Sequence, residues 1–92
     1  MKFSLIVCTY MRPKAIVALL NSVKEQELYP TEIIIVDGYT NDETKTTLKE
    51  NLYNNLLYFK VSDENRGLTK QRNFGISKVA NNIDIVCFLD DD

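Results

Sequence analysis

Three consecutive aspartates, Asp90, Asp91 and Asp92, follow an apolar run near the end of this 92-residue sequence. Alternate residues of an extended chain point the same way, so Asp90 and Asp92 would carry their carboxylates about 7 Å apart on one side. At that separation the two charges repel by roughly 2 kcal/mol at an effective dielectric constant near 20, and a divalent cation would relieve the repulsion. Oxygen ligands favour the hard cations magnesium, manganese and calcium. A solvated acidic loop is the alternative interpretation.

A divalent cation held by carboxylates and completed by water and phosphate oxygens can bind a nucleoside diphosphate. It would also act as a Lewis acid on the leaving group. Asp37 is a further carboxylate directly after an apolar run, and Gly38 behind it allows the backbone to approach a ligand closely. An aspartate in a turn or at a helix cap is the alternative interpretation of Asp37.

The positive charge nearest these carboxylates comes from Arg66, Lys70 and Arg72, which surround Gly67 at the expected start of a helix. Helix N-termini attract anions, so these residues favour an anionic ligand. A solvated helix face is the alternative, and it suits Lys70 better than Arg72. This helix is predicted to turn one face to the core. That face consists of Leu68, Arg72, Gly75, Ile76, Val79 and Ala80.

The composition excludes several classes of function. A net charge of -2 provides no broad basic field for nucleic acid, and the absence of histidine excludes Cys/His zinc sites and His-based triads. No GxGxxG or P-loop pattern is present. Cys8 and Cys87 lie within apolar runs and are predicted to be buried thiols. The N-terminal apolar run is too short for a signal peptide, which favours a cytoplasmic location, or the cytoplasmic face of a membrane for a longer protein.

Four apolar runs alternate with three helical patterns. The predicted strands are residues 3–8, 33–36, 56–61 and 83–89. The predicted helices run from residue 13 to about 27, from Thr40 to about 51 with Thr40 and Glu43 as a capping box, and from about 68 to 79. This alternation predicts an α/β fold, a Rossmann-like, four-stranded, mostly parallel sheet flanked by three helices.

Ligands of open parallel sheets bind beyond the carboxyl ends of the strands. The residues that follow the apolar runs are therefore the candidates for binding. They are Thr9 with Tyr10, Asp37 with Gly38, and the three aspartates, and all are expected at one edge of the sheet.

Four segments resemble glycosyltransferase family 2, the inverting enzymes with the GT-A nucleotide-diphosphosugar transferase fold. Residues 4–12 (SLIVCTYMR) resemble the first strand and nucleotide loop of the family, and residues 32–42 (EIIIVDGYTND) resemble its second strand and acidic turn. Residues 65–76 match the pattern NxGxxxARNxGI, except that Gln71 stands where a small residue is usual. Residues 87–92 (CFLDDD) match the DXD signature. The resemblance covers the whole chain, as the N-terminal, nucleotide-sugar-binding part of such a domain.

The resemblance implies a role for each candidate residue. Thr9, Tyr10 and Asp37 would contact base and ribose, with Gly38 beside them, and Arg72 would help to position that end of the ligand. Asp92 would ligate Mn or Mg between the phosphates. Asp90 would lie at the ribose or sugar and near the metal, and Asp91 would take either role. The implied nucleotide-sugar site is thus Thr9, Tyr10, Asp37, Gly38, Arg72, Asp90 and Asp91, with Asp92 and Asp90 at the metal.

The resemblance implies an enzyme that transfers a sugar from a nucleotide-diphosphate sugar to a hydroxyl of a saccharide or lipid-linked acceptor, with inversion and a divalent metal. The general base of the family lies beyond the DXD motif, so the catalytic residue is expected after Asp92, and the 92-residue chain is expected to bind without turnover. Cys8, Met11 and Gly38 depart from the usual residues of the family, and UDP, GDP and dTDP all remain candidates.

A non-catalytic α/β binding module is the alternative function. The isolated chain is expected to expose apolar surface or a strand edge after its last strand, and therefore to self-associate.

Overall fold

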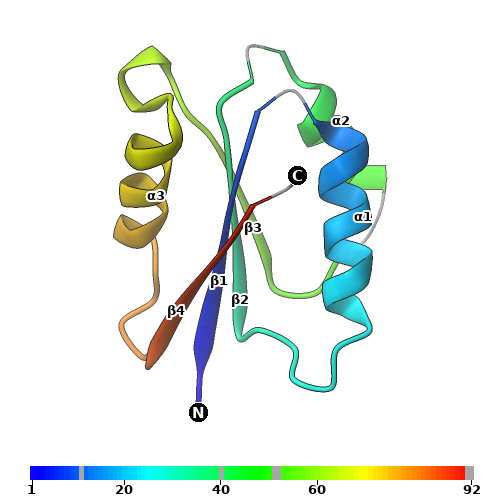
Figure 1. The fold of residues 1–92 in the computed structure, drawn as a ribbon, viewed down its shortest axis with the longest axis vertical. Helices are drawn as coiled ribbons and strands as arrows, with labels where there is room; N and C mark the ends of the chain where they lie inside the picture. Colours follow the sequence, from blue (N-terminus) through cyan, green and yellow to red (C-terminus); the bar gives the residue numbers. More distant parts are fainter. Residues whose placement is uncertain (11, 40, 51–52, 91–92) are drawn as a thin grey trace.

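The computed structural model describes residues 1–10, 12–39, 41–50 and 53–90. Within these ranges the elements are β1 (Phe3–Thr9), α1 (Pro13–Lys24), β2 (Glu32–Asp37), α2 (Glu43–Glu50), β3 (Leu56–Lys60), the short 3-10 helix η1 (Asp63–Asn65), α3 (Leu68–Ser77) and β4 (Ile85–Asp90). The strands are all parallel, in the order β3-β2-β1-β4. Helices α1 and α2 cover one face of the sheet and α3 covers the other (Figure 1). The predicted α/β fold is confirmed.

Strand β2 forms the centre of the molecule. It lies between β1 and β3, and every one of its residues is buried. Ile33 and Ile35 pack in the core beneath α1 and α2, whereas Ile34 and Val36 pack in the core beneath α3. An uninterrupted apolar run is the pattern of a parallel strand covered on both faces, which is why the sequence predicts this strand well.

Helix α3 packs on the sheet through a glycine and a glutamine. Gly75 and Gln71 are its buried residues. A Cβ atom at Gly75 would lie 2.6 Å from Cγ2 of Ile6, so only glycine permits this close approach. The predicted core face of this helix is therefore wrong in part, because Leu68 and Ile76 are 51% and 48% exposed, and because Ala80 is exposed and lies beyond the end of the helix. The close approach at position 75 decides which residues meet the sheet, and it turns Leu68 and Ile76 outward.

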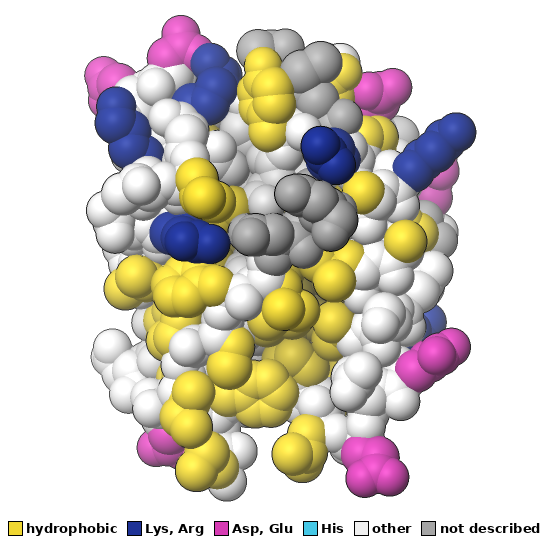
Figure 2. Space-filling model, in the orientation of Figure 1, with side chains coloured by type: hydrophobic (Ala, Val, Ile, Leu, Met, Phe, Trp, Pro, Cys, Tyr) yellow, Lys and Arg dark blue, Asp and Glu magenta, His cyan; other side chains and the backbone are white. Residues whose placement is uncertain are grey.

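Strand β4 is an edge strand with much of its apolar surface exposed. Ile85, Phe88 and Leu89 are each about 40% exposed, at 42%, 39% and 41%. Figure 2 shows hydrophobic side chains gathered on the face where β4 lies in Figure 1. The prediction of a buried thiol is wrong for Cys87, which is exposed, and Cys8 is only partly buried. Cys87 lies at an uncovered edge, where an apolar sequence run does not guarantee burial.

A groove of about 300 Å³ lies between this edge and α1. Its lining includes Phe3, Leu5, Leu19, Val23, Cys87 and Leu89. Apolar residues of β1, α1 and β4 therefore line a groove that no other described residue covers.

The helices are shorter than the sequence predicts, and α1 ends at Lys24 instead of about residue 27. Helix α2 begins at Glu43, whose backbone N–H donates to Oδ1 of Asn41 at 2.9 Å. The predicted capping residue Thr40 lies outside the described residues. In the part of the chain that the structure describes, no helix has the length and apolar character needed to cross a membrane.

Candidate functional site

The strand register brings the candidate residues to one edge of the sheet. Thr9 at the end of β1 is paired with Asp37 at the end of β2. Cys8 is paired with Asp90, so the end of β4 lies at the same level on the other side of β1. The prediction that these strand ends share one edge is confirmed. The predictions for Asp91 and Asp92 lie outside the described residues.

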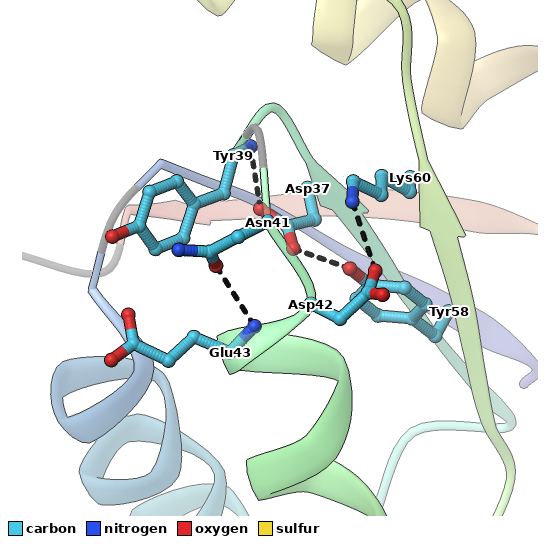
Figure 3. Close-up of polar contacts among 7 residues, drawn as sticks. All are labelled: Asp37, Tyr39, Asn41, Asp42, Glu43, Tyr58 and Lys60. Carbon is cyan, nitrogen blue, oxygen red and sulfur yellow. Dashed lines mark hydrogen bonds and ion pairs between the residues drawn. The ribbon is translucent and has the colours of Figure 1, made fainter.

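Asp37 is fully buried, with 0% exposed surface. Its Oδ1 accepts a hydrogen bond from the backbone N–H of Tyr39 at 2.9 Å, and its Oδ2 accepts one from the hydroxyl of Tyr58 (Figure 3). The first contact is the Asx-turn that aspartate forms with its own backbone two residues on. In this structure Asp37 therefore orders the turn after β2. This agrees with the alternative interpretation of Asp37 as a turn aspartate.

Tyr58 reaches Asp37 from β3, across the edge of the sheet. Burial raises the pKa of Tyr58 well above its ordinary value, and the hydrogen bond to Asp37 raises this pKa further. The phenol therefore keeps its proton and remains a donor to the carboxylate. The sequence offered no signal for this pair, since Tyr58 stands 21 residues after Asp37 in an ordinary strand pattern.

The acidic turn after β2 is tied to β3 by an ion pair. Nζ of Lys60 lies 2.9 Å from Oδ1 of Asp42 (Figure 3). The hydrogen bond and charge of Lys60 hold the pKa of Asp42 below its usual value. This pair joins solvent-exposed side chains, and such pairs contribute little to stability, so its main effect is to orient the turn.

Two tyrosines form an aromatic surface beside the strand ends. The ring centroids of Tyr10 and Tyr39 are 6.1 Å apart, and the rings are tilted by 55°. Tyr10 is 47% exposed, whereas the neighbouring Thr9 is buried. Aromatic faces of this kind stack on nucleobases. The sequence patterns pointed to Tyr10 but not to Tyr39, although Tyr39 also lies close after the end of a strand.

Gln71 connects α3 to the ends of β1 and β2. Its Nε2 donates to the backbone carbonyl of Thr9 at 3.2 Å and to that of Val36 at 3.0 Å. Its Oε1 accepts from the backbone N–H of Gly67 at 3.0 Å. From the sequence, Gln71 was notable only as a departure from the family pattern. Its contacts could not be predicted, because the carbonyls that it binds lie far away along the chain.

The two arginines near the start of α3 occupy different places. Nε of Arg66 donates to the backbone carbonyl of Gly38 at 2.6 Å, and its guanidinium forms an ion pair with Asp63. The guanidinium of Arg72 lies 5.4 Å from the ring centroid of Phe88 on β4. Arg66 therefore lies at the β2 side of the edge, and Arg72 lies against the strand that ends at Asp90.

Of the expected metal ligands Asp90 and Asp92, the structure describes only the backbone of Asp90. Among the described residues, no group of three or more acidic or cysteine side chains could hold a metal ion. Strand β4 nevertheless ends at Asp90 beside β1, which brings the start of the aspartate run to the edge with Thr9. Carboxylate oxygens suit Mg²⁺ and Mn²⁺, so the donor set fits a divalent cation.

Comparisons with known proteins agree on one family. The sequence model of the family described as Glycosyl transferase family 2 matches residues 4–92. The poly(ribitol-phosphate) beta-N-acetylglucosaminyltransferase TarS of Staphylococcus aureus is 36% identical over the whole chain, which covers 16% of TarS. The O-antigen chain rhamnosyltransferase RfbN of Salmonella typhimurium is 32% identical over the whole chain, which covers 28% of RfbN.

Solved structures agree with the sequence relatives. The crystal structure of S. aureus TarS superposes on the whole chain with a TM-score of 0.77 at 32% identity, and the chain covers 17% of it. The chain thus spans less than a third of the length of TarS and RfbN.

Proposed function

The chain belongs to glycosyl transferase family 2, and from this premise we propose that it forms the donor-binding part of an inverting, metal-dependent glycosyltransferase. The donor would be a nucleotide-diphosphate sugar, and the acceptor a hydroxyl of a saccharide or of a lipid-linked saccharide. A cytoplasmic location belongs to the same proposal.

The alignment of three strand ends is the observation that carries the proposal. The register pairs Thr9 with Asp37 and Cys8 with Asp90, so the chain's candidate residues meet at one edge of a parallel sheet. Such edges are where open α/β sheets bind their ligands. The tyrosine pair marks the β1–β2 side of this edge, and Arg72 beside Phe88 marks the β4 side.

These two sides suit the two ends of a nucleotide sugar. On the β1–β2 side, Tyr10 and Tyr39 offer ring faces to a base, and the neighbouring turn is held by Asp37. The resemblance implied that Arg72 positions the base and ribose, but its guanidinium lies against Phe88 on β4, so we propose instead that it supplies positive charge for phosphate oxygens beside the aspartates at 90–92. We therefore place the nucleoside against β1 and β2 and the diphosphate toward β4.

Transfer with inversion also requires a base for the acceptor hydroxyl. The hydroxyl would attack the anomeric carbon from the side opposite the diphosphate while a carboxylate removes its proton. We propose that this carboxylate belongs to residues that follow Asp92 in the complete protein. A bound divalent cation would supply stabilisation of the charge that develops on the departing diphosphate.

Nucleotide binding tests the proposed function directly. The complete protein should bind one of UDP, GDP and dTDP in the presence of MnCl₂ or MgCl₂, and lose about tenfold or more in affinity when EDTA replaces the metal. Isothermal titration calorimetry with each nucleotide measures this. Equal affinity with and without metal would refute the metal dependence, and no binding of any of the three would refute the donor site. Binding with no sugar transfer to any acceptor would favour the non-catalytic module.

The isolated 92-residue chain should self-associate through β4. Ile85 and Leu89 expose apolar surface on an edge strand, and such edges pair readily with other chains. Multi-angle light scattering should show a mass that rises with concentration, and Leu89→Lys should reduce this rise. Leu57→Lys tests the other edge strand, β3, where Leu57 is 44% exposed, and an equal reduction there would contradict association through β4. A monomer at all concentrations would contradict the prediction.

A further inference from the structure

Gln71 is a buried polar side chain whose hydrogen bonds all end at backbone groups. It is 4% exposed, and its amide donates two hydrogen bonds and accepts one. A buried amide with these three contacts made is a stable arrangement, and removing it takes one hydrogen bond from each of the three backbone groups. The three partners belong to β1, to β2 and to the residue before α3, so one side chain ties three segments together.

The partners of Gln71 lie in the nucleoside side of the proposed donor site. The carbonyl of Thr9 accepts from Nε2 of Gln71 and also from the backbone N–H of Gly38, at 3.2 Å and 2.9 Å. Arg66 binds the carbonyl of Gly38 at 2.6 Å. We call Gln71, Arg66 and Gly38 the α3 bracket, because residues at the start of α3 hold the loops after β1 and β2 in a fixed relation.

Gly38 and Gln71 fit together sterically. A Cβ atom at position 38 would lie 2.8 Å from Oε1 of Gln71 and 3.3 Å from Cγ of Arg66. A side chain at position 38 and the present carboxamide of Gln71 therefore compete for the same space. The absence of a side chain at Gly38 is what allows Gln71 to reach the carbonyls of β1 and β2.

We propose that Gln71 is a positioning residue for nucleoside recognition, which acts by fixing the spacing between the loop that carries Tyr10 and the loop that carries Tyr39. This inference rests on the proposed function. The two rings meet at 6.1 Å across these loops, and the bracket holds the backbone directly before each ring. Holding a loop in its bound conformation favours affinity because less ordering is needed on binding, so loss of the bracket should weaken ligand binding.

Three variants of the complete protein separate positioning from stability. Gln71→Ala removes the carboxamide, whereas Gln71→Glu keeps its size and places an acceptor opposite the carbonyls of Thr9 and Val36. Val23→Ala is the matched control, because it removes buried methyl groups from the core beneath α1, on the face of the sheet opposite α3, and destabilises the protein without touching the bracket. All three are expected to lower the melting temperature.

Calorimetry with UDP, GDP and dTDP in MnCl₂, at a temperature where every variant is folded, decides the matter. Gln71→Ala and Gln71→Glu should weaken binding of the preferred nucleotide about tenfold and reduce the preference for it over the other two, whereas Val23→Ala should stay within about twofold of wild type. Wild-type affinity and preference in both Gln71 variants would overturn the positioning role alone. A wild-type protein that binds none of the three nucleotides would overturn the proposed function with it.

The double variant provides a second, independent outcome. Gly38→Ala alone should weaken binding, because its Cβ displaces the Gln71 carboxamide. In a Gln71→Ala background the same change should cause much less further loss, since the contact at 2.8 Å is gone and the contact to Cγ of Arg66 at 3.3 Å needs only a small shift. Losses that multiply in the double variant would show that Gly38 and Gln71 act independently, and would overturn the bracket.

Discussion

Replacing Asp92 with asparagine in the complete protein should lower the Mn²⁺-dependent affinity for the preferred nucleoside diphosphate on the order of a hundredfold. Residues that merely support a metal ligand typically change metal affinity by about 10- to 100-fold, and a direct ligand should cost at least as much. The asparagine keeps the shape of the side chain and removes its charge. Calorimetry in MnCl₂ and in EDTA should show the loss only in MnCl₂, and sugar transfer should fall with it.

Glu64→Gln is the matched control for Asp92→Asn. Glu64 is an exposed acidic residue in η1, in the segment that follows β3, and its replacement removes the same single negative charge. It should leave nucleotide affinity unchanged with or without metal. If both variants weaken binding equally, the effect of Asp92 is one of general charge. If Asp92→Asn binds as wild type does, Asp92 is not a metal ligand.

Replacing Asp37 with alanine should cause the largest loss of stability among the polar residues at this edge. Two donors, the hydroxyl of Tyr58 and the backbone N–H of Tyr39, would lose a fully buried carboxylate. Hydrogen bonds to charged groups contribute about 1.5–3 kcal/mol each, so the free energy of unfolding should fall by about 3 kcal/mol or more. In a domain of this size that corresponds to a fall of roughly 12–24 °C in melting temperature, measured by circular dichroism.

Tyr58→Phe separates the two contacts of Asp37. It removes only the phenol hydroxyl, while the turn contact to Tyr39 remains. The loss should therefore be about half that of Asp37→Ala, or roughly 1.5 kcal/mol. An Asp37→Ala protein with wild-type stability would show that the carboxylate does not order the turn, and its role would then have to be sought in the ligand alone.

The sheet, and the edge at which the candidate residues lie, could be predicted because they depend on local patterns. The run Ile33–Ile34–Ile35–Val36 is apolar without interruption, which only a strand covered on both faces requires. Once the strands are parallel, their carboxyl ends must share one edge. The position of Thr9, Asp37 and Asp90 at that edge is a direct consequence.

The remaining features depend on distances between segments that are remote in the sequence. The face of α3 depends on how closely Gly75 approaches Ile6, and residue type alone favoured Leu68 and Ile76 instead. The contacts of Gln71 to Thr9 and of Tyr58 to Asp37 span 62 and 21 residues. No periodicity marks such pairs, because each side chain also fits the ordinary pattern of its own element.

The strand order has a consequence for synthesis on the ribosome. Strand β1 is synthesised before the other three strands, yet one of its two neighbours is β4. One side of β1 therefore stays unpaired until β4 is synthesised, because Phe3 pairs with Ile85. Contacts between residues so far apart form slowly, and an unpaired apolar edge is exposed to misassembly in the meantime. The nascent chain can build β1, β2 and β3 with their helices early, but the two sides of the proposed donor site meet only after β4 has emerged.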